Sequence, residues 1–520
     1  MIKKIFMHIS LIVSLVFVLL HCSPKSSSPE IGFQALSGPY LGQTLSGREP
    51  ELFLPGFITT NDYDRCIAFL ENGTLCVFLS EKKGVLYTRE INGQWTEPIK
   101  APWQEGLELA DFTGGPDGRT IFFQSRRLTG PEDTEEDTNI WVVKWTGSDW
   151  ENPYPLPHSI TTKVYPEPYP SVTSDGTVYF FSDKPGSQQA DIYRCRCING
   201  IYQEAERLPW PINTDFDEHD PFVAPDESWL MFGSRRPGVL SRDDTYICFR
   251  RKDGSWTHPL NLGSPLNSFS SENCISVTPD GKYFFFSSGR RTNIFKGKEI
   301  KTPYNDRYGD NDFYWSSTVF IRELGEKLLN KACAAEEIKK EYREKDLQAS
   351  INKLRVLYTS EQDRYYFSIY ELLTLCEDLM KTGKQVASDR FYQALLETFP
   401  SEFHFRIKLG YAKFLSMSGL VVEGLELLAE LAPDYPAVEY DVNLFVIGRD
   451  LLGRSKLEDS IKVLKENVSK FPDSFYAHFY LAEAYRQLGN IILAREHCLK
   501  TLDLYPDHGG AREILKSLNE

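Results

Sequence analysis

Charged side chains recur at fixed distances on both sides of a repeated short turn. The turn is centred on Asn72 in "LENG" and on aspartates 117, 175, 226 and 280 in "GPDG", "TSDG", "APDE" and "TPDG". Residues of opposite charge that recur in this way can bind a polar ligand or pair with one another. Eight residues before the turns stand Asp64, Leu109, Glu167, Glu218 and Glu272, and nine or ten residues after them stand Lys82, Arg126, Lys184, Arg235 and Arg290.

The turns belong to a repeat of 45 to 58 residues that is rich in strand-forming residues. Each turn precedes an apolar run such as "RTIFFQS" or "KYFFFSS", and a third run such as "NIWVV" or "DTYIC" follows. A fourth run, such as "SWTHPLNLG", ends three of the units. Four short antiparallel strands in each unit predict the blades of a β-propeller. Because each turn joins two strands as a hairpin, we expect the acids and bases to meet at one rim of the central channel.

This repeat resembles that of the TolB-type Pro-Asp repeat proteins, which are β-propellers of the cell envelope. The resemblance covers residues 35–322 and predicts an all-β propeller of five blades, with six as the alternative if the N-terminal segment contains a degenerate blade. The fifth unit lacks its fourth strand. The segment "PELFLPGFITTNDYDRC" aligns with "HPLNLGSPLNSFSSENC", so we expect the N-terminal segment to supply that strand and to remove an exposed sheet edge.

From Arg322 onward the sequence is typical of helices. We expect a helical connector over 323–364 and an all-α solenoid over 365–520, in which prolines recur at 400, 436, 472 and 506. The last unit resembles a tetratricopeptide repeat, on the residues Leu481, Ala482, Tyr485, Gly489, Ala494 and Pro506. The resemblance implies a concave peptide-binding groove lined by Tyr476, Glu483 and Arg486. The alternative is that this short solenoid only packs on the propeller or on a second copy.

Two roles remain open for the charges at the predicted rim. In the first, each blade pairs its own acid and base, and such surface pairs contribute about 0–1 kcal/mol to stability. In the second, the charges bind a peptide, a glycan or a cation. The acidic loop "DFDEHD" at 215–220 is the best single candidate. The predicted ligand-binding residues are Asp64, Asp111, Glu167, Glu218, Asp220, Glu272, Arg126, Arg235 and Arg290.

The N-terminus predicts export and a lipid anchor. Lys3 and Lys4 precede an apolar run that ends in "LLHC", which resembles the bacterial lipobox and makes Cys22 the lipidated residue. We expect a signal peptide over 1–21 and a tether over 22–34, with an ordinary secretory signal as the alternative. Ser23 after the cysteine favours the outer membrane, facing the periplasm, by analogy with lipoprotein sorting.

Composition and motifs exclude several classes of function. The net charge is −15 with no basic block, so a nucleic-acid partner is not expected. The sequence contains no GxSxG, HExxH or GxxxxGK[ST] motif and no CxxC pair, so we expect no catalysis, cofactor or metal, and mostly buried cysteines. The sequence therefore predicts a lipid-anchored envelope scaffold that binds a protein or peptide, or peptidoglycan or another glycan. The alternative is a glycan hydrolase or lyase that uses carboxylates at the propeller mouth.

Overall fold

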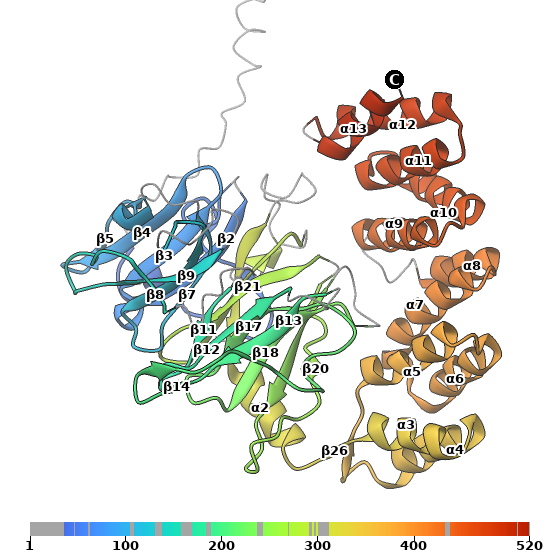
Figure 1. Ribbon diagram of the computed structural model, residues 1–520, viewed down its shortest axis with the longest axis horizontal. Helices are drawn as coiled ribbons and strands as arrows, with labels where there is room; N and C mark the ends of the chain where they lie inside the picture. Colours follow the sequence, from blue (N-terminus) through green and yellow to red (C-terminus); the bar gives the residue numbers. More distant parts are fainter. Residues whose placement is uncertain are drawn as a thin grey trace, which may run out of the picture.

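A computed structural model shows a five-bladed β-propeller followed by a column of paired helices (Figure 1). The propeller confirms the predicted five blades, and the helices confirm the predicted solenoid. None of the helices in the described part of the chain is both long and apolar enough to span a bilayer. The structure describes residues 36–518 except 46, 61–62, 105–108, 130–137, 158–168, 184–188, 237–242, 269, 291–293, 296–297, 300–310, 432–436 and 507.

Each blade is an antiparallel sheet whose first strand is innermost. The first blade consists of β2(Asp64–Leu70), β3(Leu75–Ser80), β4(Gly84–Ile91), β5(Gln94–Trp95) and β6(Ile99–Lys100), and the second of β7(Leu109–Gly114), β8(Thr120–Ser125), β9(Asn139–Lys144) and β10(Tyr154–Pro155). The third blade consists of β11(Ser171–Val172), β12(Val178–Ser182), β13(Asp191–Cys195) and β16(Glu206–Arg207), and the fourth of β17(Glu218–Val223), β18(Trp229–Ser234), β19(Asp244–Phe249) and β20(Leu260–Asn261). The fifth blade consists of β21(Glu272–Val277), β22(Tyr283–Ser288), β25(Asp312–Ser317) and β1(Glu51–Leu52). The hairpins β14(Cys197–Ile198)–β15(Ile201–Tyr202) and β23(Ile294–Phe295)–β24(Lys298–Glu299) lie outside the blades.

The repeated aspartates fix the turns between the first and second strands. The carboxylate of Asp117 accepts hydrogen bonds from the backbone N–H groups of Arg119 and Thr120. Asp226 and Asp280 accept a bond from the N–H group two residues later, from Ser228 and Lys282 respectively. Aspartate is favoured in turns because its side chain bonds the backbone in this way. The Pro-Asp part of the repeat therefore serves the fold.

The N-terminal segment closes the propeller as predicted. Strand β1 pairs antiparallel with β25, with Glu51 opposite Trp315, and thus becomes the fourth strand of the fifth blade. The next residue continues the contact, because the N–H of Phe53 donates to the carbonyl of Phe313. Phe53 is fully buried, and its ring contacts those of Phe69, Phe285 and Trp315. The first and last blades are thereby joined through one aromatic cluster.

The C-terminal half consists of helices that pair in chain order. Helix α2(Val319–Leu328) follows β25 directly, and the short parallel pair β26(Ala332–Cys333)–β27(Tyr365–Tyr366) frames the helices α3(Ala334–Glu344) and α4(Leu347–Ser360). The repeats then consist of α5(Ile369–Lys381), α6(Gln385–Thr398), α7(Ser401–Met417), α8(Val421–Leu431), α9(Ala437–Gly453), α10(Leu457–Lys470), α11(Phe475–Gln487), α12(Ile491–Leu504) and α13(Gly509–Ser517). Small residues allow close pairing, since a Cβ at Gly448 would lie 2.5 Å from the Leu464 side chain.

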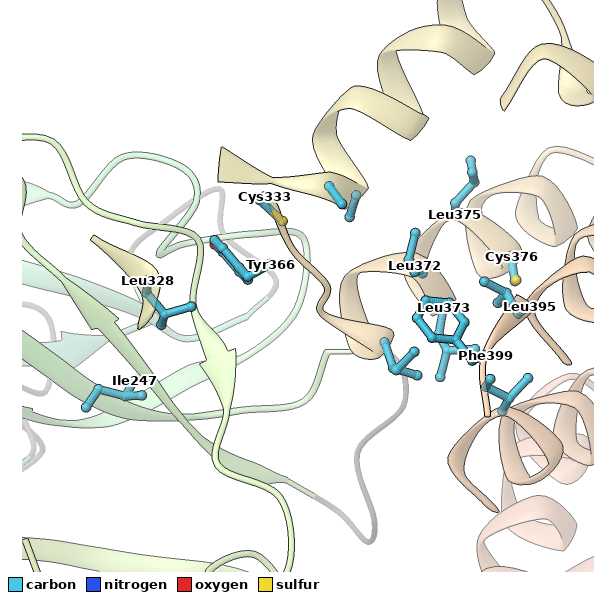
Figure 2. Packing of buried hydrophobic residues seen from close by; sticks show 14 of the residues in the cluster. Ile247, Leu328, Cys333, Tyr366, Leu372, Leu373, Leu375, Cys376, Leu395 and Phe399 are labelled. Carbon is cyan, nitrogen blue, oxygen red and sulfur yellow. The ribbon is translucent and has the colours of Figure 1, made fainter. Parts of the chain in front are cut away.

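The propeller and the first helical repeats share one hydrophobic core (Figure 2). Figure 2 shows Ile247 of β19 and Leu328 of α2 on the propeller side, with Tyr366 between them and α5. The Tyr366 hydroxyl also donates to the carbonyl of His258 in the fourth blade. Because apolar burial dominates stability, this shared core fixes the start of the helical column against the propeller.

Candidate functional site

The acids at the start of the inner strands hold the preceding loop in place. The carboxylate oxygens of Asp64, Glu218 and Glu272 each accept a hydrogen bond from the backbone N–H four residues earlier, at 2.9, 2.8 and 3.1 Å respectively. All three side chains are buried. Carboxylates that are held in this way are positioned by the fold and have limited capacity left for a ligand.

Two of these acids also pair with arginines from the second strand. Glu272 Oε1 lies 3.0 Å from Arg290 Nη2, and Glu218 Oε1 lies 3.4 Å from Arg236 Nε. The exposed fractions of these side chains are 2% and 9% in the first pair and 0% and 2% in the second. Burial raises the pKa of Glu218 and of Glu272, and the guanidinium groups partly offset this effect. These are buried braces, whereas the sequence predicted exposed surface pairs.

The structure also corrects the choice of arginine in the fourth blade. Arg236, and not Arg235, is the equivalent of Arg290, because each arginine donates to the serine two residues before it and to the loop carbonyls near the cis proline. Arg235 instead pairs with Asp217. The sequence count placed the basic residue nine or ten positions after the turn centre, so it could not distinguish Arg235 from Arg236. The strand pairs Glu218–Ser234 and Glu272–Ser288 define the register, and this register makes Arg236 the equivalent of Arg290.

The structure describes only some of the remaining predicted rim residues. Arg126 is exposed, and the backbone N–H of its neighbour Arg127 makes the repeated contact with Ser125. Glu167 lies outside the described residues, as do Lys184 and Cys22. In the fourth and fifth blades the rim charges thus form buried pairs, and a binding role for the predicted rim residues stays a prediction.

A second ring of residues lies two positions after the aligned residues 64, 109, 167, 218 and 272, four of which are acids. It consists of Cys66, Asp111, Tyr169, Asp220 and Cys274, and each belongs to the stretch at the start of an inner strand. Register shifts occur next to these positions in β2, β7, β17 and β21, and Tyr169, Asp220 and Cys274 have positive φ. A bulge re-aims side chains, and here it gathers chemically reactive groups near the channel.

Asp111 is the most connected member of this ring. Arg65 Nη2 lies 2.8 Å from its Oδ1, and the thiols of Cys66 and Cys274 donate to the same oxygen. Burial raises the pKa of Asp111, although the charge of Arg65 opposes the increase. The sequence prediction included Asp111 and Asp220 but not the two cysteines. The recurrence two residues after each acid was the signal that could have identified them.

His219 lies between two carboxylates on the same part of the fourth blade. Its Nδ1 lies 3.6 Å from Asp220 Oδ1 and its Nε2 lies 3.6 Å from Asp243 Oδ2. Burial alone would lower the pKa of His219, but the two carboxylates raise it to about 10. A pKa raised in this direction favours the protonated ring at neutral pH, and its positive charge would offset part of the acidic loop.

The opposite end of the channel contains a cavity of about 1270 Å³. Its lining includes Pro116, Pro225 and Pro279 of the repeated turns and Ile321 and Arg322 of α2. Helix α2 thus borders this end of the channel. The rim charges contribute nothing to the cavity, because they stand at the start of the inner strands and the turns stand at the end.

The first helices of successive repeats form a groove. A pocket of about 380 Å³ lies among α5, α7 and α9 and is lined by Glu377, Lys413, Arg449 and Asp450, among others. Glu377, Lys413 and Arg449 stand 36 residues apart, one per repeat, and Glu483 follows 34 residues later. Asp450 Oδ2 lies 2.9 Å from Lys413 Nζ, and its Oδ1 lies 2.9 Å from Arg449 Nη2. The groove thus presents both acidic and basic side chains, with two successive cations between two acids along the repeats.

The three predicted groove residues all lie on α11. Glu483 and Arg486 pair with one another across one turn of the helix, and Gln487 also donates to Glu483. Tyr476 stacks on Phe445 of α9, with ring centroids 5.0 Å apart. The sequence prediction missed Glu377, Lys413 and Arg449, which occupy in earlier repeats the position of Glu483.

Comparison with known proteins assigns no family. No protein-family model and no curated protein matches the chain. Similar solved structures include two described as MamA: one from AMB-1 (16% identity over 36% of this chain and 95% of that chain, TM-score 0.21) and one from MSR-1 (19% identity over 28% of this chain and 82% of that chain, TM-score 0.19). Another is a GH43_12 protein retrieved from a capybara gut metagenome (13% identity over 54% of this chain and 55% of that chain, TM-score 0.32). At these identities and TM-scores, none of the three structures assigns a family or a function to this chain. Its architecture is that of a five-bladed β-propeller with a tetratricopeptide-like helical solenoid.

Proposed function

We propose that this chain is a non-catalytic binding protein, anchored by lipid to the bacterial envelope, whose helical groove holds a segment of a partner protein. The supporting observation is the charged pocket among α5, α7 and α9, on the face formed by the first helix of each pair. In Figure 1, α6, α8 and α10 lie on the side of the column that faces away from the propeller. The helices that line most of the pocket, α5, α7 and α9, are therefore on the side of the column nearer to the propeller.

The charges in the pocket favour a peptide that carries both polar and acidic groups. Lys413 and Arg449 both pair with the carboxylate of Asp450, Glu377 lines the same pocket, and the side chains of Lys413 and Arg449 are 43% and 37% exposed. An ammonium group has three donors and a guanidinium five, so these two partly exposed cations retain hydrogen-bond donors for an incoming carboxylate or backbone carbonyl. Polar groups of this kind in a helical groove determine specificity, whereas the surrounding apolar surface supplies affinity.

The propeller supports the groove at a fixed position. Arg236 Nη1 lies 3.7 Å from Glu371 Oε1 of α5, and the ring of Tyr370 packs edge-on against Tyr246 of the fourth blade. The ring of Tyr370 also lies beneath the guanidinium of Arg406 on α7. In a helical repeat array, each repeat contacts only the neighbouring repeats. Contacts that clamp α5 to the propeller therefore fix the first repeat and reduce the entropy that a partner must overcome on binding.

The test is a displayed library of random peptides selected on the purified chain. Selected peptides should bind the wild type and lose at least tenfold in affinity for Lys413→Glu combined with Arg449→Glu. The loss should diminish at high salt because exposed charge contacts are screened. Lys462→Glu on α10 is the matched control, since this lysine is exposed on a second helix of a pair. Peptides that bind both variants equally would show that the groove is not the binding site.

A further inference from the structure

We propose that Cys66, Asp111 and Cys274 form a binding site for a thiophilic divalent cation such as Zn²⁺ at the centre of the propeller. The three residues come from the inner strands of the first, second and fifth blades. One ligand atom from each lies within 4.8 Å of the other two, and all three side chains are buried. The site joins blades that are far apart in the sequence.

The distances between the ligand atoms match those of a tetrahedral zinc site. Zinc binds sulfur at about 2.3 Å and a carboxylate oxygen at about 2.0 Å, so a tetrahedral angle separates the sulfur and oxygen by about 3.5 Å. Asp111 Oδ1 lies 3.5 Å from Cys66 Sγ and 3.7 Å from Cys274 Sγ. Both sulfur–oxygen separations are thus close to those of a tetrahedral site, and the two sulfurs lie within 4.8 Å of one another.

The charges of the site also balance when a divalent cation is bound. Binding replaces the protons of the two thiols, which leave as two H⁺, so that two thiolates and one carboxylate surround the metal. The divalent cation and its three anionic ligands together then carry one net negative charge, and Arg65, which contacts both oxygens of Asp111 at 2.8 and 2.9 Å, compensates it. A buried site with zero net charge avoids the large cost of an unpaired buried ion.

Hydrogen bonds from neighbouring side chains hold the three residues in place. Gln124 Nε2 donates to Asp111 Oδ2 at 3.4 Å, and the Tyr169 hydroxyl donates to the carbonyl of Ile275, next to Cys274, at 2.9 Å. Asp111 Oδ1 remains available to the metal because a carboxylate oxygen can accept more than one partner. Outer contacts of this kind orient metal ligands and affect the affinity. Three protein ligands leave the fourth position of a tetrahedral site to water.

The surroundings of these two thiols differ from those of a cysteine that is simply packed in the core. Cys248, for comparison, is fully buried in β19 and donates only to the carbonyl of Leu230. Cys66 and Cys274 instead share one carboxylate next to an arginine, although a small apolar residue would satisfy the packing equally well. Two thiols and a carboxylate also provide the soft and borderline ligands that favour zinc over magnesium or calcium.

The experiment uses the full purified chain, reduced and treated with a chelator, and titrates it with Co²⁺ followed by Zn²⁺. We expect one Co²⁺ per chain, a thiolate-to-cobalt absorption band, and displacement of cobalt by Zn²⁺. Cys66→Ser, Cys274→Ser and Asp111→Asn should each lower the affinity more than 100-fold, and Arg65→Gln should lower it about 10- to 100-fold. Cys248→Ser should bind like the wild type, and circular dichroism should show that each variant is folded.

A second measurement keeps the proposal falsifiable if a variant does not fold. Zn²⁺ should protect two thiols of the wild-type chain from alkylation, and mass spectrometry should identify them as Cys66 and Cys274. Three results would overturn the proposal. These are the absence of a thiolate-to-cobalt band, protection of other cysteines, and a Cys66–Cys274 disulfide in the chain isolated from cells without added oxidant.

Discussion

The guanidinium of Arg236 in the propeller lies 3.7 Å from the carboxylate of Glu371 in the first helical repeat. The same arginine lies 3.4 Å from Glu218, and Glu371 accepts a 2.9 Å bond from Lys339 of α3. All of these side chains are at most 14% exposed. A buried row of alternating charges therefore runs from the inner strand of the fourth blade into the helical column.

Glu371→Gln should destabilise the contact between the two parts of the chain. The change leaves Arg236 and Lys339 in a buried site without their shared carboxylate, and the loss of one partner of a buried ion pair costs about 3–5 kcal/mol. Denaturant unfolding followed by circular dichroism measures this cost. Glu397→Gln is the control, because Glu397 is 64% exposed in its pair with Arg355 and should change stability by less than about 1 kcal/mol. Equal effects of the two changes would contradict the prediction.

Glu272→Gln should cost more than a surface pair would allow. The carboxylate is buried with Arg290, Ser268 and Ser288, so the change removes one partner of a buried ion pair, at about 3 kcal/mol. Adding Arg290→Met should recover part of the loss, since the uncompensated charge is then removed. A double-mutant cycle from unfolding curves measures this coupling. If the single change costs less than about 1 kcal/mol and the second change recovers nothing, the pair behaves like an exposed surface pair and the prediction is wrong.

Phe53→Ala should weaken the closure of the propeller. The fully buried ring packs against Phe69 of the first blade and Phe285 and Trp315 of the fifth, and removing such a ring costs about 3–5 kcal/mol. Unfolding followed by tryptophan fluorescence should show a lower midpoint. Ile99→Ala on β6 serves as the control because Ile99 is 55% exposed. A midpoint as high as that of the control would mean that β1 is dispensable for closure.

The stability of the propeller should decrease between about pH 6.5 and pH 10. Asp220 and Asp243 raise the pKa of His219 to about 10, so the folded chain retains a proton that the unfolded chain releases near pH 6.5. The stabilisation is complete below pH 6.5 and is lost as the pH rises through 10, with a slope of the order of 1 kcal/mol per pH unit. His219→Gln should remove this slope, and NMR titration should show the ring protonated at neutral pH. A ring that titrates near 6.5 would contradict the prediction.

Cys22→Ala should release the chain into the soluble periplasmic fraction. The prediction depends on the lipobox-like "LLHC", which lies outside the described residues. Mass spectrometry of the mature wild-type chain should show an N-terminus at a lipidated Cys22, and detergent partitioning should separate wild type from variant. Retention of the variant in the membrane fraction, or a mature N-terminus at another residue, would show that the anchor lies elsewhere.

The architecture could be predicted from the sequence because each repeat contains its own turn and strand signals. The turns near Asp117 and Asp280 bond their own backbone, so a local signal sets a local structure. The pairing of β1 with β25 was also predictable, because an unpaired sheet edge is costly and one segment remained to cover it. The buried state of most cysteines follows in the same way, since eight of the nine described ones are buried.

The details of the site were less predictable because they depend on single residues and on distant contacts. Arg235 and Arg236 are adjacent and equally basic, and only the pairing of Glu218 with Ser234 identifies which one faces inward. The approach of Cys66 to Cys274 depends on ring closure and on bulges that composition does not reveal. The contact of Arg236 with Glu371 depends on how the propeller and the helical column pack together, and no local pattern encodes that geometry.

The strand that closes the propeller has a mechanical consequence. Strand β1 lies close to the N-terminal segment, and its hydrogen-bonded neighbour β25 leads directly into α2 and the helical column. A pulling force applied between β1 and the helices would therefore enter and leave the propeller through adjacent strands of one blade. A force applied further toward the N-terminus would also load the first blade, because Trp95 donates to the carbonyls of Leu36 and Gly38. The two-residue ladder Glu51–Trp315 and Leu52–Tyr314 would share such a load with the first blade.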